Sequence, residues 1–516
     1  MSKEASMFLA NDLVGTANQT TNHDQPVEDL PLPLGFAWGT ATAAYQVEGG
    51  VSQDGKGKLS DIKGEPSNIQ HKSIWDTYTH LEPSRTNNEN ADTACDHYNR
   101  MPEDVKLMKS LGVDAYRFSI AWSRIIPLGG RNDPVNEKGI RFYNNLIDNL
   151  LAHGIEPVAT LYHWDLPQTI YDRYGGFLNT EEFRADFARY SRLCFSLFGD
   201  RVKKWITFNE PYIISIFAHF NGTLAPGRCA ETGADTKTEP WRVGHTIILA
   251  HADIVQMYVE EFQPSQNCTI SIVLNGHYYE PYDADSKADC DAAQRRLEFY
   301  IGWFGDPVFL GKDYPPAMRA YLGQRLPDFP PAERDLLRCT APMNAFYGMN
   351  HYSTKYARAF QGEPAEDDWT GNIEESSINS QGQEIGPVSG VYWLRTAPEG
   401  FRKLMSWKLY QSDEHSDERM VRAIDMGWFI LSKYYRLTDE VPVYAAALLL
   451  DPRKRIAYIK QNWPKEWHED TIASATAFWQ KEFNYEQPSD HPSTPTSMPP
   501  PLAKKLNQLA ILSKKL

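Results

Sequence analysis

A single carboxylate in the middle of the chain follows an apolar stretch, in a setting suited to proton transfer. Residues Trp205–Phe208 are aromatic or β-branched, which favours a short buried strand. Asn209 and Glu210 come next, and Pro211 cannot donate a hydrogen bond to a neighbouring strand, so strand pairing ends there. Glu210 is therefore expected at the C-terminal rim of this strand. A carboxyl group placed there can give and take protons, although the stretch alone also fits a solvated strand end.

The segments around this strand alternate between helix and strand. Apolar residues recur at helical spacing over 102–112, 139–153, 181–198 and 246–262. After a first apolar run that begins at Leu34, strands are expected over 115–122, 156–165, 205–210, 269–274 and 345–350. Such alternation predicts a parallel sheet, and the polar residues just past each strand favour a barrel over an open sheet.

Composition limits the classes of function. With 516 residues, of which 41% are apolar, the chain can form one barrel of common size with additional segments. A formal net charge of −15 argues against a nucleic-acid partner or an anionic membrane surface. The 6 cysteines are scattered without CxxC spacing, so we expect no metal and no cofactor. The polar N-terminus and the absence of a long apolar run predict no signal peptide and no membrane span, which makes the cytoplasm the default location.

Eight motifs occur in a fixed order along the first three-quarters of the chain. They are FAWGTATAAYQVEG (36–49), SIWD (73–76), YRFSIAWSR (116–124), LYHWDLPQ (161–168), TFNEP (207–211), APG (225–227), FYGMNHY (346–352) and WLRTAPEGF (393–401). Together they resemble glycoside hydrolase family 1, the β-glucosidase family, from about residue 33 to about residue 407. The resemblance implies an α/β fold, a (β/α)8 TIM-type barrel.

The resemblance also implies a role for individual residues. Glu210 would be the general acid/base of a retaining mechanism, which protonates the glycosidic oxygen and later deprotonates a water. A β-glucoside or oligosaccharide would be the ligand. Its hydroxyls would be bound by Gln46, His163 and Asn209, with Tyr352 also in contact and with Trp122 and Trp164 as aromatic walls. For Arg117 and His163, a buried polar network without a catalytic role remains the alternative.

The second carboxylate of the family is missing from the sequence. In the family this nucleophile lies in a Thr-Glu-Asn-Gly stretch after the seventh strand, and Arg117, Asn350 and Tyr352 would surround it. The sequence contains no Glu-Asn-Gly, and the nearest similar stretch, 441–449, has Ala447 in the place of the nucleophile. The Trp-Ser motif that follows the family's eighth strand is also missing after Trp407. We therefore expect a barrel that lacks the last two β/α units.

The C-terminal fifth of the chain has a different character. Apolar stripes over 418–437 and 470–483 indicate amphipathic helices, and about 418–485 resembles a fragment of hAT-superfamily transposases. Residues 488–501 are rich in Pro, Ser and Thr. The expected organisation is a disordered extension (1–32), a truncated barrel (33–407), a foreign helical segment (408–487) and a Pro-rich disordered tail (488–516).

Three functional hypotheses follow from these observations. The first is a working β-glucosidase, which fits most of the chain but lacks its nucleophile. The second is a non-catalytic or strongly impaired descendant that keeps a sugar-binding pocket and is fused to a transposase fragment. The third is a nucleic-acid-binding transposase, which the negative charge and the missing acidic triad oppose. The second hypothesis explains both parts of the chain and is the one we favour.

Overall fold

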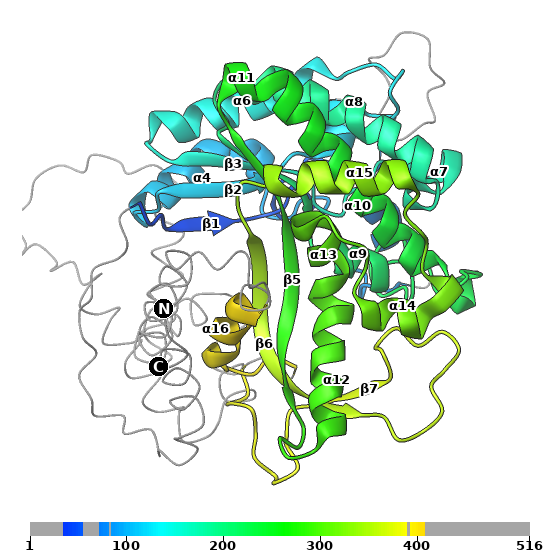
Figure 1. The fold of residues 1–516 in the computed structure, drawn as a ribbon. Helices are drawn as coiled ribbons and strands as arrows, with labels where there is room; N and C mark the ends of the chain where they lie inside the picture. The colour runs from blue at the N-terminus through cyan, green and yellow to red at the C-terminus, as the bar shows by residue number, and fades with distance from the viewer. Residues whose placement is uncertain (1–34, 55–71, 82–83, 390–392, 408–516) are drawn as a thin grey trace, which may run out of the picture. The chain divides into compact units, whose positions relative to one another are not determined.

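One curled sheet of seven strands organises the protein (Figure 1). The computed structural model describes residues 35–54, 72–81, 84–389 and 393–407. The strands follow the order of the chain, and β1 to β6 are parallel to one another whereas β7 is antiparallel to β6. The strands are β1 (Gly39–Ala41), β2 (Ala115–Ser119), β3 (Glu156–Tyr162), β4 (Lys204–Asn209), β5 (Thr269–Pro281), β6 (Gly348–Ala359) and β7 (Ile373–Ser376).

Helices connect the parallel strands and cover the sheet. The longer ones are α4 (His97–Ser110), α6 (Glu137–Ala152), α8 (Thr180–Phe198), α10 (Glu239–Met257), α12 (Lys287–Leu297), α15 (Pro331–Thr340) and α16 (Pro398–Trp407). The shorter ones are α2 (Ala44–Val47), α3 (Ile74–Thr79), α5 (Trp122–Ile125), α7 (Gln168–Tyr174), α9 (Pro211–Ile216), α11 (Gln263–Gln266), α13 (Trp303–Leu310) and α14 (Pro316–Leu322). Figure 1 shows α12 running alongside β5, and β5 and its neighbour β6 are the two longest strands of the sheet.

The helix ends follow from local sequence. Asn136 accepts a hydrogen bond from the Lys138 N–H at the start of α6, and Asn179 accepts one from the Glu182 N–H at the start of α8. The apolar side of α8 faces the sheet. Its residue Phe187 and the fully buried Trp205 of β4 belong to the same hydrophobic core. The core is therefore continuous from the helical layer to the strand that leads to Glu210.

The expected alternation of strands and helices is confirmed, with two differences. β5 and β6 run on to Pro281 and Ala359, well past the predicted ends of the strands, and β7 was not expected. β7 pairs with the end of β6, Ala359 opposite Ile373, after a turn at Gly371 and Asn372 with φ values of 85° and 63°. The sheet edges also fit a partial barrel, because among the described strands β1 pairs only with β2, and β6 only with β5 and β7.

Other predictions concern residues that the structure does not describe. The N-terminal extension up to residue 32, the segment 408–487, the tail 488–516 and Ala447 lie outside the described residues. Among the helices of 35–54, 72–81, 84–389 and 393–407, none combines the length and the apolar character that a membrane crossing requires.

Candidate active site

Glu210 lies directly after the last residue of β4, in an unusual backbone conformation. Its φ and ψ are 53° and 66°, in the left-handed region that residues other than glycine rarely adopt. The Glu210 N–H donates to the carbonyl oxygen of Val273 on β5 at 2.8 Å, and Pro211 then begins α9, a position that suits proline. Only 4% of Glu210 is exposed to solvent. The strand end is therefore buried. The alternative that the sequence left open, a solvated strand end, is wrong.

Two side chains of β6 hold the Glu210 carboxylate. The Nδ2 amide of Asn350 donates to Oε1 at 2.6 Å, and the hydroxyl of Tyr352 donates to the same oxygen at 2.9 Å. Asn350 and Tyr352 are two positions apart on one strand, so both point to the same face of the sheet. Two of the three residues that the family resemblance assigns to the missing second carboxylate therefore contact the first one.

Asn209 ties a second set of residues to this carboxylate. Its Oδ1 accepts hydrogen bonds from Nη2 of Arg117 at 2.6 Å and from Nδ2 of Asn350 at 3.1 Å. The Arg117 Nε also donates to Oγ1 of Thr160 at 3.0 Å, and the Trp164 indole donates to the backbone oxygen of Asn209 at 2.8 Å. Side chains from β2, β3, β4 and β6 thus form one hydrogen-bonded group, as the clustering of polar residues past the strand ends predicted.

Burial sets the charge balance of the group. It raises the pKa of Glu210, because a buried carboxylate loses its hydration, whereas the donors Asn350 and Tyr352 and the charge of Arg117 act in the opposite direction. Burial also lowers the pKa of Arg117 to about 10, which leaves this side chain cationic at neutral pH. A carboxyl whose pKa is raised keeps its proton more readily than a surface carboxyl, as a general acid requires.

A cavity of about 400 Å³ opens at this group. Its lining includes eight of the nine residues that the sequence singled out for the site: Gln46, Arg117, His163, Trp164, Asn209, Glu210, Asn350 and Tyr352. Ala41, Thr42, Met349 and His351 complete the lining in the described part of the chain. Glu210 is the one carboxylate among these lining residues. A cavity of this size, with convergent hydrogen-bonding groups, suits a small polar ligand.

His163 is a neutral group in this cavity. Burial is the main cause that lowers its pKa, to about 3, and the charge of Arg117 adds to the effect. Its Nδ1 is buried without a hydrogen-bond partner among the described residues. The imidazole therefore lines the cavity without carrying a charge at neutral pH.

One predicted wall of the pocket is wrong. Trp122 is fully buried in the core, its indole donates to the Gly129 oxygen at 3.1 Å, and its ring stacks on Tyr190 with a centroid distance of 4.8 Å. The helix α5 begins at this residue and turns the indole away from the strand end. Trp164, with a left-handed φ of 74°, turns its ring toward the cavity instead.

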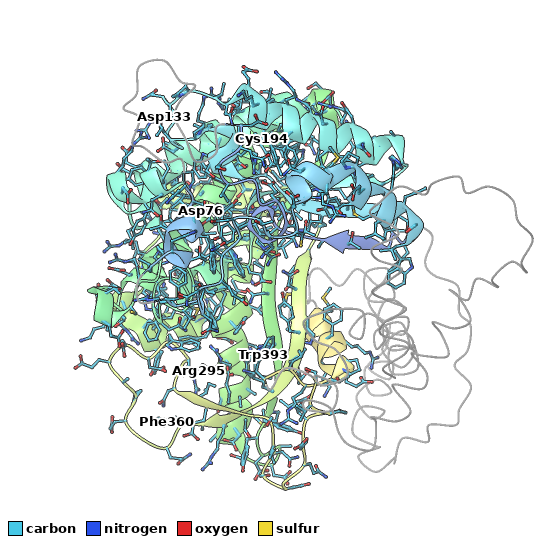
Figure 2. All side chains as sticks on the ribbon, turned by 180° about the vertical axis from the view of Figure 1, so that it is seen from behind. Asp76, Asp133, Cys194, Arg295, Phe360 and Trp393 are labelled. Carbon is cyan, nitrogen blue, oxygen red and sulfur yellow. The ribbon has the colours of Figure 1, made fainter. Side chains whose placement is uncertain are left out.

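Sequence reasoning missed the contributions of His351 and Trp393, although both belong to motifs that it recognised. His351 lines the cavity and uses Nδ1 to bond the Gly276 oxygen at 3.0 Å. Trp393 lies beside β5 and β6 (Figure 2), with ring-centroid distances of 6.3 Å to His277 and 6.2 Å to Tyr352. Membership of a motif was the available signal, but it does not tell which way a side chain points.

The comparison with known proteins agrees with this geometry. The family model described as glycosyl hydrolase family 1 matches residues 29–415. Beta-glucosidase 1B of Phanerodontia chrysosporium is 46% identical over 380 residues, which cover 73% of this chain and 66% of that protein. The chain thus spans about two-thirds of the length of this relative.

Solved structures show the same likeness. A family 1 β-glucosidase from Humicola insolens, solved in complex with glucose, has a TM-score of 0.68 and 46% identity, and the match covers 74% of this chain and 76% of that one. The β-glucosidase of Trichoderma harzianum matches with a TM-score of 0.68, 45% identity and coverage of 75% and 77%. On the family model, the relatives and the site together, the chain belongs to glycoside hydrolase family 1.

Proposed function

We propose that the cavity binds β-glucosides and that Glu210 is the acid/base group of the site. The observation that carries this proposal is the placement of Glu210, which is buried at the 400 Å³ cavity with hydrogen bonds from Asn350 and Tyr352. The names of the relatives, which include β-glucosidases, and the glucose complex of the Humicola structure support the class of ligand.

Sugar recognition is assigned to the polar lining. Gln46, His163 and Asn209 provide amide and imidazole groups that can bond the hydroxyls of one pyranose ring, and Tyr352 lies next to Glu210. Trp164 provides a flat apolar surface of the kind on which the C–H face of a sugar ring packs. None of these roles requires a metal or a cofactor.

Turnover by the usual two-step route is proposed to be strongly impaired. A retaining glycosidase needs a second carboxylate about 5–5.5 Å from the acid/base to attack the anomeric carbon. The sequence has no Glu-Asn-Gly, and Glu210 is the one carboxylate that lines the cavity in the described ranges. Loss of a nucleophile costs on the order of 10⁶ in turnover in a well-studied protease. Proton donation by Glu210 would leave roughly 10²–10⁴ over water.

A small anion tests both halves of this proposal. The purified full chain is incubated with an aryl β-glucoside, with and without azide. Azide attacks the anomeric carbon from the face opposite the aglycone, the C–O bond breaks, and Glu210 gives its proton to the departing aryloxide, which yields an α-glucosyl azide and a phenol. We expect slow cleavage without azide and a clear increase with it.

The matched control is Glu210→Gln, which preserves shape but cannot give a proton. It should lower azide-assisted cleavage of a substrate with a poor leaving group far more than that of a dinitrophenyl glucoside, which needs no acid. Cleavage at the rate of ordinary β-glucosidases without azide, lost in Glu210→Gln, would contradict the missing nucleophile. Binding of the glucoside without any response to azide would instead favour a sugar-binding protein that has no catalytic role.

The C-terminal part supports a second element of the proposal. The family model ends at residue 415, and the sequence from about 418 to 485 resembles an hAT-superfamily transposase fragment. We infer that a truncated glycosidase gene was joined to a transposon-derived segment. Sequencing the transcript across codons 407–418 tests the junction, because a transcript that continues into a Glu-Asn-Gly motif would show the two parts to be separate.

A further inference from the structure

A buried arginine is linked to the helix that begins directly after the acid/base residue, and it is not among the residues that line the cavity. Arg296 on α12 is 1% exposed. Its Nη2 donates to the Tyr212 hydroxyl at 3.0 Å, and its Nε donates to Oε1 of Glu375 at 3.0 Å. The guanidinium lies near four aromatic rings, at 5.8, 5.5, 5.2 and 5.0 Å from the centroids of Tyr212, Tyr279, Tyr300 and Trp369. A buried cation is costly unless it is paired in this way.

The partner carboxylate is fixed in turn by three donors. Glu375 on β7 accepts hydrogen bonds from Arg296, from the Tyr279 hydroxyl at 2.7 Å and from Nζ of Lys355 at 2.5 Å. Although burial alone would raise the pKa of Glu375, the charges of Arg296 and Lys355 hold it well below its usual range, so the carboxylate stays ionised. The unexpected strand β7 thus supplies the anchor for Arg296.

Tyr212 connects this anchor to the active site. It is the second residue of α9 and follows Glu210 by two positions, and it is 1% exposed. Its ring stacks on Tyr300 at a centroid distance of 3.8 Å, and the Tyr300 hydroxyl accepts a hydrogen bond from Nδ2 of Asn275 at 3.1 Å. Asn275 on β5 lies opposite Asn350 in the strand register, and Asn350 is the residue that bonds Glu210.

Glu210 therefore has supports on two sides. Its carboxylate is held from β6, and the first turn of α9 is held through Tyr212. The left-handed backbone at Glu210 persists only if its surroundings enforce it. None of Arg296, Tyr212 and Tyr300 is among the cavity-lining residues of the described chain, so these groups do not contact a ligand there.

We propose that Arg296 is a positioning residue: acting through Tyr212, it fixes the first turn of α9 and with it the buried placement of the Glu210 carboxyl. The part that concerns catalysis rests on the proposed function of Glu210. The part that concerns placement does not, and it is tested without any turnover.

Thermal unfolding reports the burial of Glu210 through the stability cost of its ionised carboxyl. In the parent protein, Glu210→Gln should raise the Tm at pH 7 and leave it unchanged near pH 4, because burial penalises only the ionised carboxyl. If Arg296→Met frees α9, the carboxyl gains water and this penalty shrinks. We therefore expect Glu210→Gln to raise the Tm at pH 7 by less than half as much in an Arg296→Met background as in the parent protein.

Three further variants separate positioning from other effects. Tyr212→Phe removes only the hydroxyl that Arg296 bonds. In this background too, Glu210→Gln should raise the Tm at pH 7 by less than half as much as in the parent, so the test remains decisive if Arg296→Met does not fold. Arg296→Lys keeps the charge but cannot bond Tyr212 and Glu375 together, so it should behave like Arg296→Met if the hydrogen bonds matter and like the parent if only charge matters. Arg184→Met is the matched control, since Arg184 pairs with Asp253 through Nε at 2.6 Å on helices that cover the sheet.

A purely structural arginine would lower the Tm by the same amount with and without Glu210→Gln, as we expect for Arg184→Met. Such additivity for both Arg296→Met and Tyr212→Phe would overturn the proposal. It would also be overturned if Glu210→Gln raised the Tm at pH 7 by as much in the Arg296→Lys protein as in the parent. If the rise in Tm caused by Glu210→Gln becomes smaller in these backgrounds as expected, but azide never promotes cleavage, the positioning role stands and only the proposed function of Glu210 fails.

Discussion

The Asn350 amide on β6 donates a hydrogen bond of 2.6 Å to the Glu210 carboxylate at the end of β4, across the place of the intervening strand β5. The same amide group bonds Oδ1 of Asn209 at 3.1 Å, so its two hydrogens serve two consecutive residues. In a site with a second carboxylate, the resemblance to the family would give Asn350 another partner. Here Asn350 and Tyr352 both bond Glu210, and these bonds determine how the site should respond to pH and to substitution.

Removal of the Tyr352 hydroxyl should raise the pKa of Glu210 further. The hydroxyl donates to the ionised carboxylate at 2.9 Å and thereby lowers the pKa that burial raises. In Tyr352→Phe the acid form should persist to higher pH, so the alkaline limb of azide-assisted cleavage of an aryl glucoside moves upward. Tyr314→Phe, which removes a buried hydroxyl bonded to His245, is the control and should leave the limb in place. A limb that moves downward in Tyr352→Phe would contradict the assignment.

The stability of the protein should depend on Glu210 in one pH window. Because the folded pKa is raised, the ionisation of Glu210 opposes folding; the cost is absent below the unfolded pKa of about 4.3 and complete above the folded pKa. Glu210→Gln should therefore be more stable than the parent at pH 7 to 8 and equally stable near pH 4. Denaturant unfolding at several pH values measures this. A variant that is less stable at pH 7 and gains stability relative to the parent as the pH falls would have the wrong sign.

Ligand binding should not register a titration of His163. Its pKa is lowered to about 3, far below the usual value of about 6.5, so the ring stays neutral from pH 5 to pH 8. Calorimetric titration with a β-glucoside should give an affinity that does not fall as the pH passes from 7.5 to 5.5. A fall over that range that disappears in His163→Gln would show a charged imidazole. Loss of affinity at every pH in His163→Ala would agree with its role in binding.

A buried ion pair close in sequence to a cavity residue should be important for stability. Nη2 of Arg124 lies 3.0 Å from Oε2 of Glu48, which is two residues after Gln46, and both side chains are almost wholly buried. Glu48→Ala leaves the guanidinium unpaired, so the free energy of unfolding should fall by about 3–5 kcal/mol. Glu103→Ala breaks the exposed pair with Arg100, which water and salt screen, and should cost far less. Equal losses in chemical unfolding would contradict the importance of burial.

The sequence predicted much of this arrangement because local patterns carry it. Glu210 follows a β-branched and aromatic stretch and precedes proline, and eight of the nine predicted site residues meet at one cavity because parallel strands end at one rim. The misplacement of Trp122 has a local cause, since whether an indole after a strand turns inward depends on where the next helix begins. Arg296 could not be found in this way. Its partners Tyr212 and Glu375 are 84 and 79 positions away in the sequence, and Glu375 lies on β7, a strand that the sequence did not predict.

The most direct test of the central claim, a cavity with an acid/base and no nucleophile, is covalent trapping. The full chain is incubated with a 2-deoxy-2-fluoro-β-glucoside that carries an activated leaving group, and its intact mass is measured, with a family 1 β-glucosidase that has both carboxylates as the positive control. We predict that the control gains the mass of one fluoroglucosyl group while this chain keeps its original mass, although it binds the compound. A fluoroglucosyl ester mapped by peptide mass spectrometry to any Asp or Glu of this chain would contradict the claim.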